Sequence, residues 1–518
     1  MKLKIVSTLT LLLCCQLTLA REEFYTAAVF AHNPFADGVK KDVSSRDEAL
    51  KVMMANLDVL ETQTAKAEAE GTDIFVFPEY GLIGLKSFSN EMSLSYFVET
   101  IPDPKINPTF CPCDSGEMPG QEVLYRLSCI AKNHSMYIAV NMGDKQPCVE
   151  SCPLTGHYQY NTEAVFNPSG CLVAKYHKEN LFLAEKLFWN VPKTVDISYF
   201  DTEFGRFGLM ICFDAVFQSP AVDLVEKYNV TDIIFSTAWM NVYPHYISTA
   251  YHSGWARTMR VNYLSSNIQY PESRYLGSGI YSPNGVLGYT FNQSSTTGQL
   301  VIAQVPLNAN RTSPKHPHAN IQTNFVSENT FSSKIFDDTF LFVPVSGLSG
   351  NISVCSGTVC CHLEFTRSDT NEFYALGVFN GMHYLEGEYY LEVCLLVRCA
   401  SARQNCGTAL QNTTTTTFTS YKLTGSMNTP YAFPEVVSPD LNFTTDWDFV
   451  DEGYVKTISG ENKRLASVVL MARNFDKDPS LTNSTIDVIP NSADYIRVSS
   501  CLMLLTALWM MLSNSALY

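Results

Sequence analysis

The sequence predicts an α/β layered domain followed by a smaller β-rich domain. Between about residues 24 and 305, short apolar runs alternate with helical periodicity, and several runs are apolar throughout, as in sheet strands covered by helices. From Thr339 the helical pattern fades and strand-like segments continue among six cysteines. A polar, proline-bearing stretch at 308–317 is typical of a linker. We therefore expect domains at 21–315 and 325–490.

The first domain opens with a strand–helix–strand unit. A strand at 24–30 precedes a helix with the capping pair Ser45 and Glu48, which ends at Gly71, and a buried strand follows at 74–77. This order predicts parallel pairing if both strands share a sheet. Further helices are expected at 124–131, at 255–263 and from an N-cap at Ser219 with Pro220 to Tyr228. Further strands are expected at 136–140, 158–166, 171–176, 207–211, 232–236, 264–268, 279–289 (a hairpin) and 300–305.

The second domain is expected to contain strands and few helices. The sequence predicts strands at 340–345, 362–365, 374–379, 389–397 and 418–423.

Both ends of the chain carry targeting signals. Lys2 and Lys4 precede an apolar run, and Thr18-Leu19-Ala20 suits signal peptidase, so 1–20 is predicted to be removed. Small residues at Asn491-Ser492-Ala493, a polar spacer and a short apolar tail predict a glycosylphosphatidylinositol (GPI) signal at 491–518, with lipid attached near Asn491. The alternatives are a weak tail anchor or a merely hydrophobic terminus. An extracellular, membrane-anchored protein is expected.

Composition supports export and argues against some partners. The net charge of -16 argues against nucleic acid or an anionic membrane surface as partner. The 10 histidines are scattered, so we expect no metal and no cofactor. Asn-X-Ser/Thr sequons typical of a secreted glycoprotein begin at Asn133, Asn229, Asn292, Asn310, Asn351, Asn412, Asn442 and Asn483.

The cysteine count leaves one thiol over. Three of the 16 cysteines lie in the predicted signal and tail, so thirteen remain in the mature chain. Twelve fall into two clusters of six, which allows three bridges in each region. Cys212 alone lies at the end of a buried strand, far from the others. A reduced cysteine in an oxidising compartment usually has a chemical role. The alternative is that Cys212 forms half of a disulfide.

Three polar residues follow predicted strands where open α/β sheets place their sites. Glu79 follows the strand at 74–77, Lys178 follows the strand at 171–176, and Cys212 follows the strand at 207–211. Taken singly, Glu79 could be solvated and Lys178 a surface charge. Together they suit amide hydrolysis. Cys212 would be the nucleophile and Glu79 the proton acceptor, while Lys178 and a backbone N–H such as that of Phe213 would stabilise the oxyanion.

The surrounding residues resemble the nitrilase superfamily. Pro78-Glu79, Lys178-Glu179-Asn180-Leu181-Phe182 and Ile211-Cys212-Phe213-Asp214 are similar to its three motifs. The resemblance implies an αββα sandwich with a Glu-Lys-Cys site. Within the superfamily, the chain resembles the vanin/biotinidase branch over nearly the whole mature chain, through Thr237-Ala238-Trp239-Met240-Asn241, Gly277-Ser278-Gly279-Ile280-Tyr281 and Cys360-Cys361-His362-Leu363.

The branch resemblance implies a substrate. Asn241-Val242-Tyr243-Pro244-His245 resembles vanins, which implies cleavage of the linear amide of pantetheine to pantothenate and cysteamine. A biotin-amide hydrolase or an inactive adhesion scaffold are the alternatives. Phe213 and Trp239 are expected at the substrate, and Glu185 as a second glutamate of the site. Tyr80 and Leu85 depart from the family pattern. Cys113 and Cys171 resemble additions to it and are expected to pair with each other.

Overall fold

The computed structural model describes residues 23–34, 43–85, 87–307, 329–400, 405–407, 414–441, 444, 447–450, 454–457 and 463–479. The predicted signal peptide, the linker at 308–317, the GPI signal with Asn491, and four sequons lie outside these residues; the sequons are Asn310, Asn412, Asn442 and Asn483. Of the other sequons, Asn133, Asn229 and Asn351 are exposed and Asn292 is half-buried. None of the described helices is both long and apolar enough to cross a membrane.

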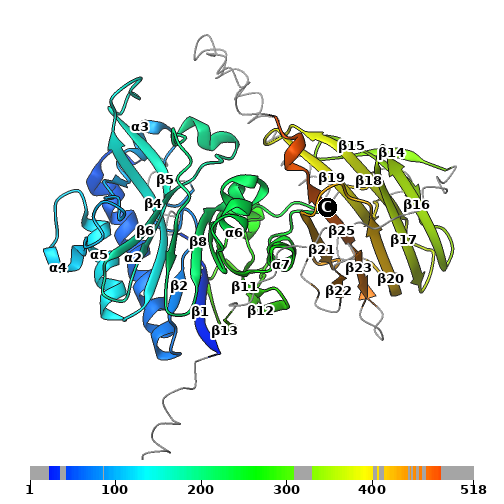
Figure 1. Ribbon diagram of the computed structural model, residues 1–518, viewed down its shortest axis with the longest axis horizontal. Coiled ribbons are helices and arrows are strands. Elements are labelled where there is room, and N and C mark those ends of the chain that lie inside the picture. Colours follow the sequence, from blue (N-terminus) through cyan, green and yellow to red (C-terminus); the bar gives the residue numbers. More distant parts are fainter. Residues whose placement is uncertain are drawn as a thin grey trace, which may run out of the picture. The chain divides into compact units, whose positions relative to one another are not determined.

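The first sheet has the order β13-β1-β2-β4-β5-β6, with β3 beside β4 (Figure 1). β1 and β2 pair in parallel, as the strand–helix–strand unit predicted. Alternate residues of β2 serve different layers: Phe75 packs toward the helices, whereas Ile74 and Val76 pack between the sheets. The strands are β1 Phe24–Ala31, β2 Ile74–Val76, β3 Val98–Glu99, β4 Tyr137–Pro147, β5 His157–Phe166, β6 Leu172–His177 and β13 Gln299–Pro306.

The second sheet has the order β12-β11-β10-β9-β8-β7. Its centre is parallel, because β8, β9 and β10 run side by side in one direction. These three strands are buried almost throughout, which fits a sheet covered on both faces. The strands are β7 Tyr199–Asp201, β8 Arg206–Ile211, β9 Asp232–Thr237, β10 Asn262–Asn267, β11 Ser278–Ser282 and β12 Gly285–Thr290.

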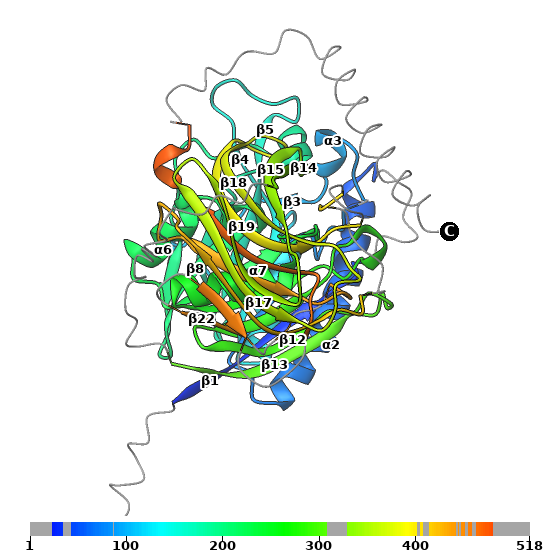
Figure 2. The ribbon, with the colours of Figure 1, turned by 90° about the vertical axis from the view of Figure 1, so that its right-hand side faces the viewer.

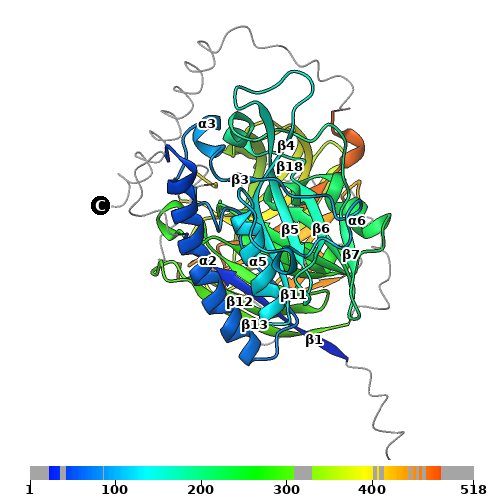
Figure 3. The same ribbon diagram turned by 90° about the vertical axis from the view of Figure 1, so that its left-hand side faces the viewer.

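Helices cover the outer faces of these two sheets, so the predicted αββα arrangement is confirmed. α2 and α5 lie over the first sheet, as Figure 3 shows from their side, and α6 and α7 lie beside the second. The α-helices are α2 Arg46–Ala69, α3 Glu91–Leu94, α4 Pro112–Ser115, α5 Glu122–Asn133, α6 Asp223–Glu226 and α7 Ser248–Met259. Short helical turns are η1 Leu183–Leu187, η2 Cys212–Val216, η3 Gln218–Val222, η4 Pro271–Ser273 and η5 Phe475–Lys477.

Two predicted helix boundaries are wrong. α7 begins at Ser248, well before the predicted start at Trp255, and Tyr263 belongs to β10. Glu435 explains the early start, because its carboxylate accepts the N–H groups of Tyr246 and Ile247 and so caps the helix from the second domain. Ser219 has the extended backbone of an N-cap, as predicted, although its hydroxyl donates to Glu179.

The second domain consists of two further sheets, seen face-on in Figure 2. Their orders are β14-β15-β18-β19-β25-β21 and β16-β17-β20-β23-β22, with β24 beside β20. This confirms a β-rich second domain, and the structure adds strands that the sequence did not predict, notably β16, β21 and β25. The strands are β14 Phe331–Ile335, β15 Asp338–Pro344, β16 Ser349–Ser356, β17 Val359–Arg367, β18 Tyr374–His383, β19 Tyr389–Arg398, β20 Thr417–Gly425, β21 Ala432–Val437, β22 Trp447–Val450, β23 Tyr454–Thr457, β24 Lys463–Arg464 and β25 Ser467–Arg473.

Six disulfides lie among the described residues, three in each predicted cluster. They are Cys111–Cys171, Cys113–Cys129, Cys148–Cys152, Cys355–Cys360, Cys361–Cys394 and Cys399–Cys406. Cys212 is a free, buried thiol. The expectation of three bridges in each region with Cys212 left over is therefore confirmed.

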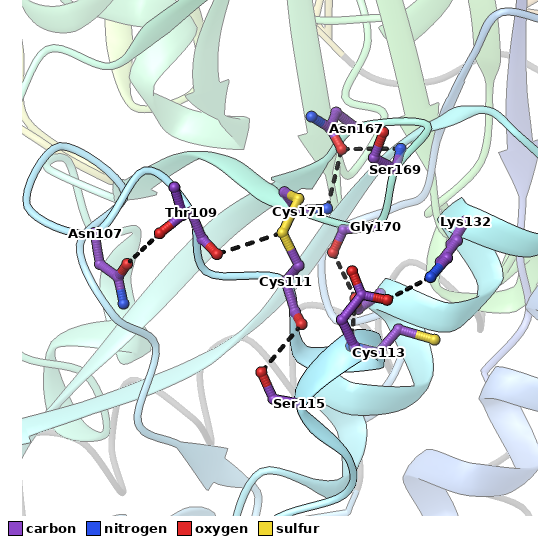
Figure 4. Close-up of a disulfide and its surroundings, with 12 residues drawn as sticks. Asn107, Thr109, Cys111, Cys113, Ser115, Lys132, Asn167, Ser169, Gly170 and Cys171 are labelled. Carbon is purple, nitrogen blue, oxygen red and sulfur yellow. Dashed lines mark hydrogen bonds and ion pairs between the residues drawn. A yellow bond between two sulfur atoms is a disulfide. The ribbon is translucent and has the colours of Figure 1, made fainter.

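The predicted pairing of Cys113 with Cys171 is wrong. Cys171 pairs with Cys111, which precedes α4 (Figure 4). Cys113 lies within α4 and pairs instead with Cys129 of α5. Adjacent contacts hold this arrangement: Ser128 of α5 accepts the N–H of Cys113 and donates to the carbonyl of Gly170. Two cysteines separated by one residue thus reach different elements, which their spacing alone does not reveal.

Candidate active site

The structure brings the three predicted strand-end residues together at one edge of the sandwich. Glu79 lies just beyond β2, Lys178 directly after β6, and Cys212 directly after β8. Glu79 and Lys178 are each about 1% exposed and Cys212 8% exposed. Charged side chains are rarely buried this fully unless they are paired, so this edge is built to hold them.

Glu79 is held through both carboxylate oxygens. Its Oε1 accepts from Lys178 Nζ at 2.8 Å and from Asn161 Nδ2 at 2.8 Å, while Oε2 accepts the N–H of Ala238 at 2.8 Å. Ala238 directly follows β9, so the second sheet orients a carboxylate that comes from the first. Burial raises the pKa of Glu79 above its ordinary value, against the opposing effect of Lys178. A buried carboxylate of raised pKa is suited to accept a proton.

Lys178 lies between two carboxylates. Its ammonium donates to Glu79 Oε1 at 2.8 Å and to Glu185 Oε2 at 2.6 Å. Burial alone would lower the pKa of Lys178, but Glu185 and Glu79 outweigh it and raise this pKa well above its ordinary value. Lys178 therefore stays a cation at all physiological pH values. Glu185 lies where the sequence placed a second glutamate of the site, and it fixes the lysine head.

Asn161 and Tyr80 complete the cluster, although neither was predicted from the sequence to be a site residue. Asn161 Nδ2 donates one hydrogen to Glu79 at 2.8 Å and the other to Glu185 at 3.0 Å. The Tyr80 hydroxyl donates to Glu185 at 2.6 Å and accepts from the indole N–H of Trp189 at 2.9 Å. The signal for Asn161 was a run of polar residues inside an otherwise apolar strand.

Cys212 occupies a strained turn between β8 and η2. Its backbone φ is +48°, in the left-handed region that residues other than glycine seldom adopt. Asp214 stabilises this turn by accepting the N–H of Ile211 at 3.0 Å and the Tyr176 hydroxyl at 2.8 Å. Burial, and then the Glu79 carboxylate, raise the pKa of the Cys212 thiol, while Lys178 opposes them. Cys212 thus rests as a thiol beside a carboxylate and an ammonium.

The two predicted substrate contacts are buried aromatic residues: Phe213 directly follows Cys212, and Trp239 follows Ala238, whose N–H bonds Glu79. Phe213 packs edge-on against Phe182 and Phe217 and also reaches Tyr389 of the second domain. Trp239 donates its indole N–H to the carbonyl of Tyr246 at 2.9 Å. Their contact with a substrate stays a prediction.

The second domain packs against the elements around this site. Arg473 of β25 donates to the carbonyl of Val216 at 2.7 Å, and Tyr243 donates to the carbonyl of Ala466 at 2.8 Å. A Cβ built at Gly387 would lie 3.3 Å from the ring of Phe213. A larger residue at 387 would therefore press on the residue next to Cys212.

The arrangement contains the parts needed for nucleophilic attack on a carbonyl. It offers a thiol, a carboxylate base and a fixed cation, oriented by Asn161 and by the backbone of Ala238. Within the described residues, no group of three or more His, Cys, Asp or Glu side chains could hold a metal ion. The prediction that no cofactor is needed stays a prediction.

Comparisons with known proteins agree with this fold and site. Residues 46–314 match the family model described as carbon-nitrogen hydrolase. Residues 329–478 match the model described as vanin C-terminal domain. The protein is thus a hydrolase acting on carbon–nitrogen bonds of amides.

Curated relatives narrow the class. The chain is 40% identical to a pantetheinase of Homo sapiens over 88% of this chain and 90% of that protein. It is 40% identical to a pantetheinase of Canis lupus familiaris over 92% and 93% of the two chains. A biotinidase of Rattus norvegicus is 34% identical over 88% of this chain and 94% of the relative. The chain belongs to the vanin family of carbon-nitrogen hydrolases.

Proposed function

We propose that the protein hydrolyses the linear amide of pantetheine to pantothenate and cysteamine through a thioester on Cys212. The observation that carries the proposal is the buried cluster of Glu79, Lys178 and Cys212 in a chain 40% identical to pantetheinases. Catalysis by these three residues is part of the proposal.

Acylation starts from the neutral thiol. Cys212 attacks the amide carbonyl as Glu79 accepts the thiol proton, so no free thiolate needs to form in this buried site. The carbonyl oxygen becomes an oxyanion, which the Lys178 ammonium and a backbone N–H such as that of Phe213 stabilise. Glu79 then donates its proton to the nitrogen of the leaving cysteamine as the C–N bond breaks and the thioester forms.

Deacylation reverses the proton path. Glu79, again a carboxylate, accepts a proton from the water that attacks the thioester carbonyl. The tetrahedral intermediate collapses, the C–S bond breaks, and the Cys212 sulfur recovers the proton from Glu79 as pantothenate leaves. Glu185, Asn161 and the N–H of Ala238 keep the acid–base pair in register through both halves.

The test is turnover of pantetheine and of biocytin by purified protein, with Cys212→Ala as the blank. We expect cysteamine release above the blank and little biotin release. Preferential biotin release would instead support the biotin-amide alternative, which the similarity to biotinidase raises. Absence of both activities would contradict the proposed function.

We also propose that the protein is exported and held at the cell surface by a GPI lipid near Asn491. Six disulfides support an oxidising compartment. Release of active protein from cells by a phosphatidylinositol-specific phospholipase, and its loss from the membrane when 491–518 is deleted, would be the expected results. Retention after the phospholipase treatment would contradict lipid attachment.

A further inference from the structure

Glu163 is a buried carboxyl group that the mechanism above does not use. It lies on β5, is 0% exposed, and pairs across the sheet with Asn141 of β4 and Tyr176 of β6. Directly opposed residues share a face of the sheet. Asn141 donates to the Asn161 amide that holds Glu79, and Tyr176 donates to the Asp214 carboxylate that holds the Cys212 turn. Glu163 thus lies between Asn141, which helps to hold Glu79, and Tyr176, which helps to hold the Cys212 turn.

Glu163 reaches the opposite sheet through a single hydroxyl. Its Oε1 lies 2.9 Å from Ser236 Oγ of β9, and the same Oγ lies 2.6 Å from the carbonyl oxygen of Phe77. A serine hydroxyl has one hydrogen to donate, and a carbonyl can only accept. With that hydrogen on Phe77, the contact between Ser236 and Glu163 is a hydrogen bond only if Glu163 supplies the proton.

The surroundings of Glu163 also disfavour a carboxylate. Its Oε2 is buried with no hydrogen-bond partner. An ionised carboxylate with an unpartnered oxygen away from water would be costly. Burial, together with the negative charge of Glu79, raises the pKa of Glu163 well above its ordinary value. Glu79 is the charged group that acts on it, and the Tyr176 hydroxyl is engaged with Asp214.

We propose that Glu163 is a neutral carboxylic acid that positions Glu79, donating to Ser236 Oγ, which in turn donates to the carbonyl of Phe77. Phe77 lies two residues before Glu79, so this chain of hydrogen bonds fixes the end of β2 against the second sheet. Because Glu163 is neutral, it fixes the end of β2 without adding a further negative charge near Glu79 and Glu185. Glu163 is a positioning residue and touches no substrate.

Three variants test this role, which rests on the proposed function for its activity readouts. Glu163→Leu and Ser236→Ala each break the chain of hydrogen bonds, and we expect kcat to fall about 10- to 100-fold with little change in KM. Glu163→Gln retains a donor and no charge, so it should recover most of the lost kcat. It should also keep the acid limb of the pH profile of kcat/KM in place.

Contradictory results are distinct for each variant. If Glu163 is ionised in the working enzyme, Glu163→Gln removes a negative charge beside Glu79 and lowers the acid-limb pKa by about one unit or more. A native kcat in Ser236→Ala would contradict positioning through Ser236. If Glu163→Leu is not secreted, the kcat values of Glu163→Gln and Ser236→Ala still test the proposal. A Glu163→Gln protein that fails to fold would also contradict the proposal, because a neutral isostere should be tolerated.

An infrared measurement needs no substrate. The protonated-carboxyl band of the native protein at neutral pH should lose intensity in Glu163→Gln, and absence of that loss would contradict the proposal. Asp232→Asn is the matched control, because Asp232 is a buried carboxyl at the other end of β9 that bonds Tyr25, Thr231 and Asn262. The Asp232→Asn variant should leave the acid limb of the pH profile of kcat/KM unchanged. Failure of the proposed function would appear separately, as absence of pantetheine turnover in the native protein.

Discussion

Lys175 and Lys178 are two buried lysines at the end of one strand, and their surroundings differ. Lys175 is 9% exposed, and its ammonium donates to the carbonyl of Ile101 at 2.8 Å and to Asp144 at 3.1 Å. Asp144 also accepts the N–H of Ile101, the Gln146 amide and the His177 ring. Lys178 is about 1% exposed and lies between two carboxylates. The charges of this group act on the pKa of the free thiol of Cys212.

The difference shows that a buried ion pair is by itself no sign of catalysis. Lys175 holds β3, β4 and β6 together, and each partner of Asp144 is a structural group. Around Lys178, two carboxylates share one ammonium, and we propose that one of them, Glu79, exchanges a proton with Cys212. Two negative charges buried around one cation are energetically costly, and this feature distinguishes the proposed active site from the Lys175 pair.

Replacing each lysine with methionine should give the largest difference between the two regions: one variant should lose activity and the other should lose stability. Lys178→Met removes the oxyanion cation and leaves Glu79 and Glu185 facing each other, so kcat should fall by about three orders of magnitude or more. Lys175→Met should lower the free energy of unfolding by about 3–5 kcal/mol, because Asp144 loses its lysine partner. The kcat per folded molecule should stay near native. Active-site titration gives kcat per folded molecule, and urea unfolding gives the free energy of unfolding. A native kcat in Lys178→Met would contradict the proposed role of Lys178 in catalysis.

Asn161→Ala should give the next largest effect. One amide divides its two hydrogens between Glu79 and Glu185, so its loss loosens both. We expect kcat to fall about 10- to 100-fold, the value of a hydrogen bond to a charged group. The steady-state rates decide, and Gln146→Ala, which removes an amide from Asp144 instead, is the control. Equal losses of kcat in Asn161→Ala and Gln146→Ala would contradict the proposed difference between the surroundings of Lys178 and Lys175.

Tyr80→Phe should have a smaller effect at the same carboxylate. It removes one donor to Glu185 and the acceptor for the indole of Trp189 while the ring stays in place. A decrease in kcat of about 3- to 10-fold is expected, since Lys178 and Asn161 still hold Glu185. A decrease as large as that of Lys178→Met would mean that the hydroxyl itself takes part in the chemistry.

The smallest effect on catalysis is expected at a third buried cation, His383 of the second domain. Its ring nitrogens lie 2.7 Å from Asp338 and 2.7 Å from Glu386. Burial lowers its pKa, but hydrogen bonds to Asp338 and Glu386 outweigh this and raise the pKa from 6.5 to about 9. Its contribution to stability is complete below about pH 6.5 and is lost as pH rises through about 9.

The melting temperature measured from pH 6 to 10 tests this. The native protein should lose about 1–3 kcal/mol of stability over that window. In His383→Gln the loss should be smaller over the same range. Identical pH slopes for the two proteins would show that His383 is not charged in the folded state. Turnover at neutral pH should change little in the variant.

The sequence predicted the three proposed catalytic residues because each lies just beyond a strand, where a polar side chain is not needed for packing within the sheet. Asn161 and Glu163 were missed because they lie inside β5, and a strand buried on both faces hides which polar residues face each other. Tyr80 was noted only as a departure from the family pattern. Its bond to Glu185 joins residues 105 positions apart, which no local pattern reports.

The wrong predictions share a physical cause. α7 starts early because Glu435 caps it from another domain, and Cys113 pairs with Cys129 because α4 packs on α5. In each case the deciding contact is tertiary. Local signals succeeded where the deciding interaction is also local, as with the N-cap at Ser45, whose hydroxyl accepts the N–H of Glu48.

We propose that Cys212 carries the acyl group during turnover. The most direct measurement is acid quenching of the purified protein during pantetheine hydrolysis, followed by mass spectrometry of the peptide that contains Cys212. We expect a pantothenoyl thioester on Cys212 that accumulates when deacylation is slowed and is absent from Cys212→Ala. Product formation with an unmodified Cys212, or hydrolysis by Cys212→Ala at the native rate, would contradict it.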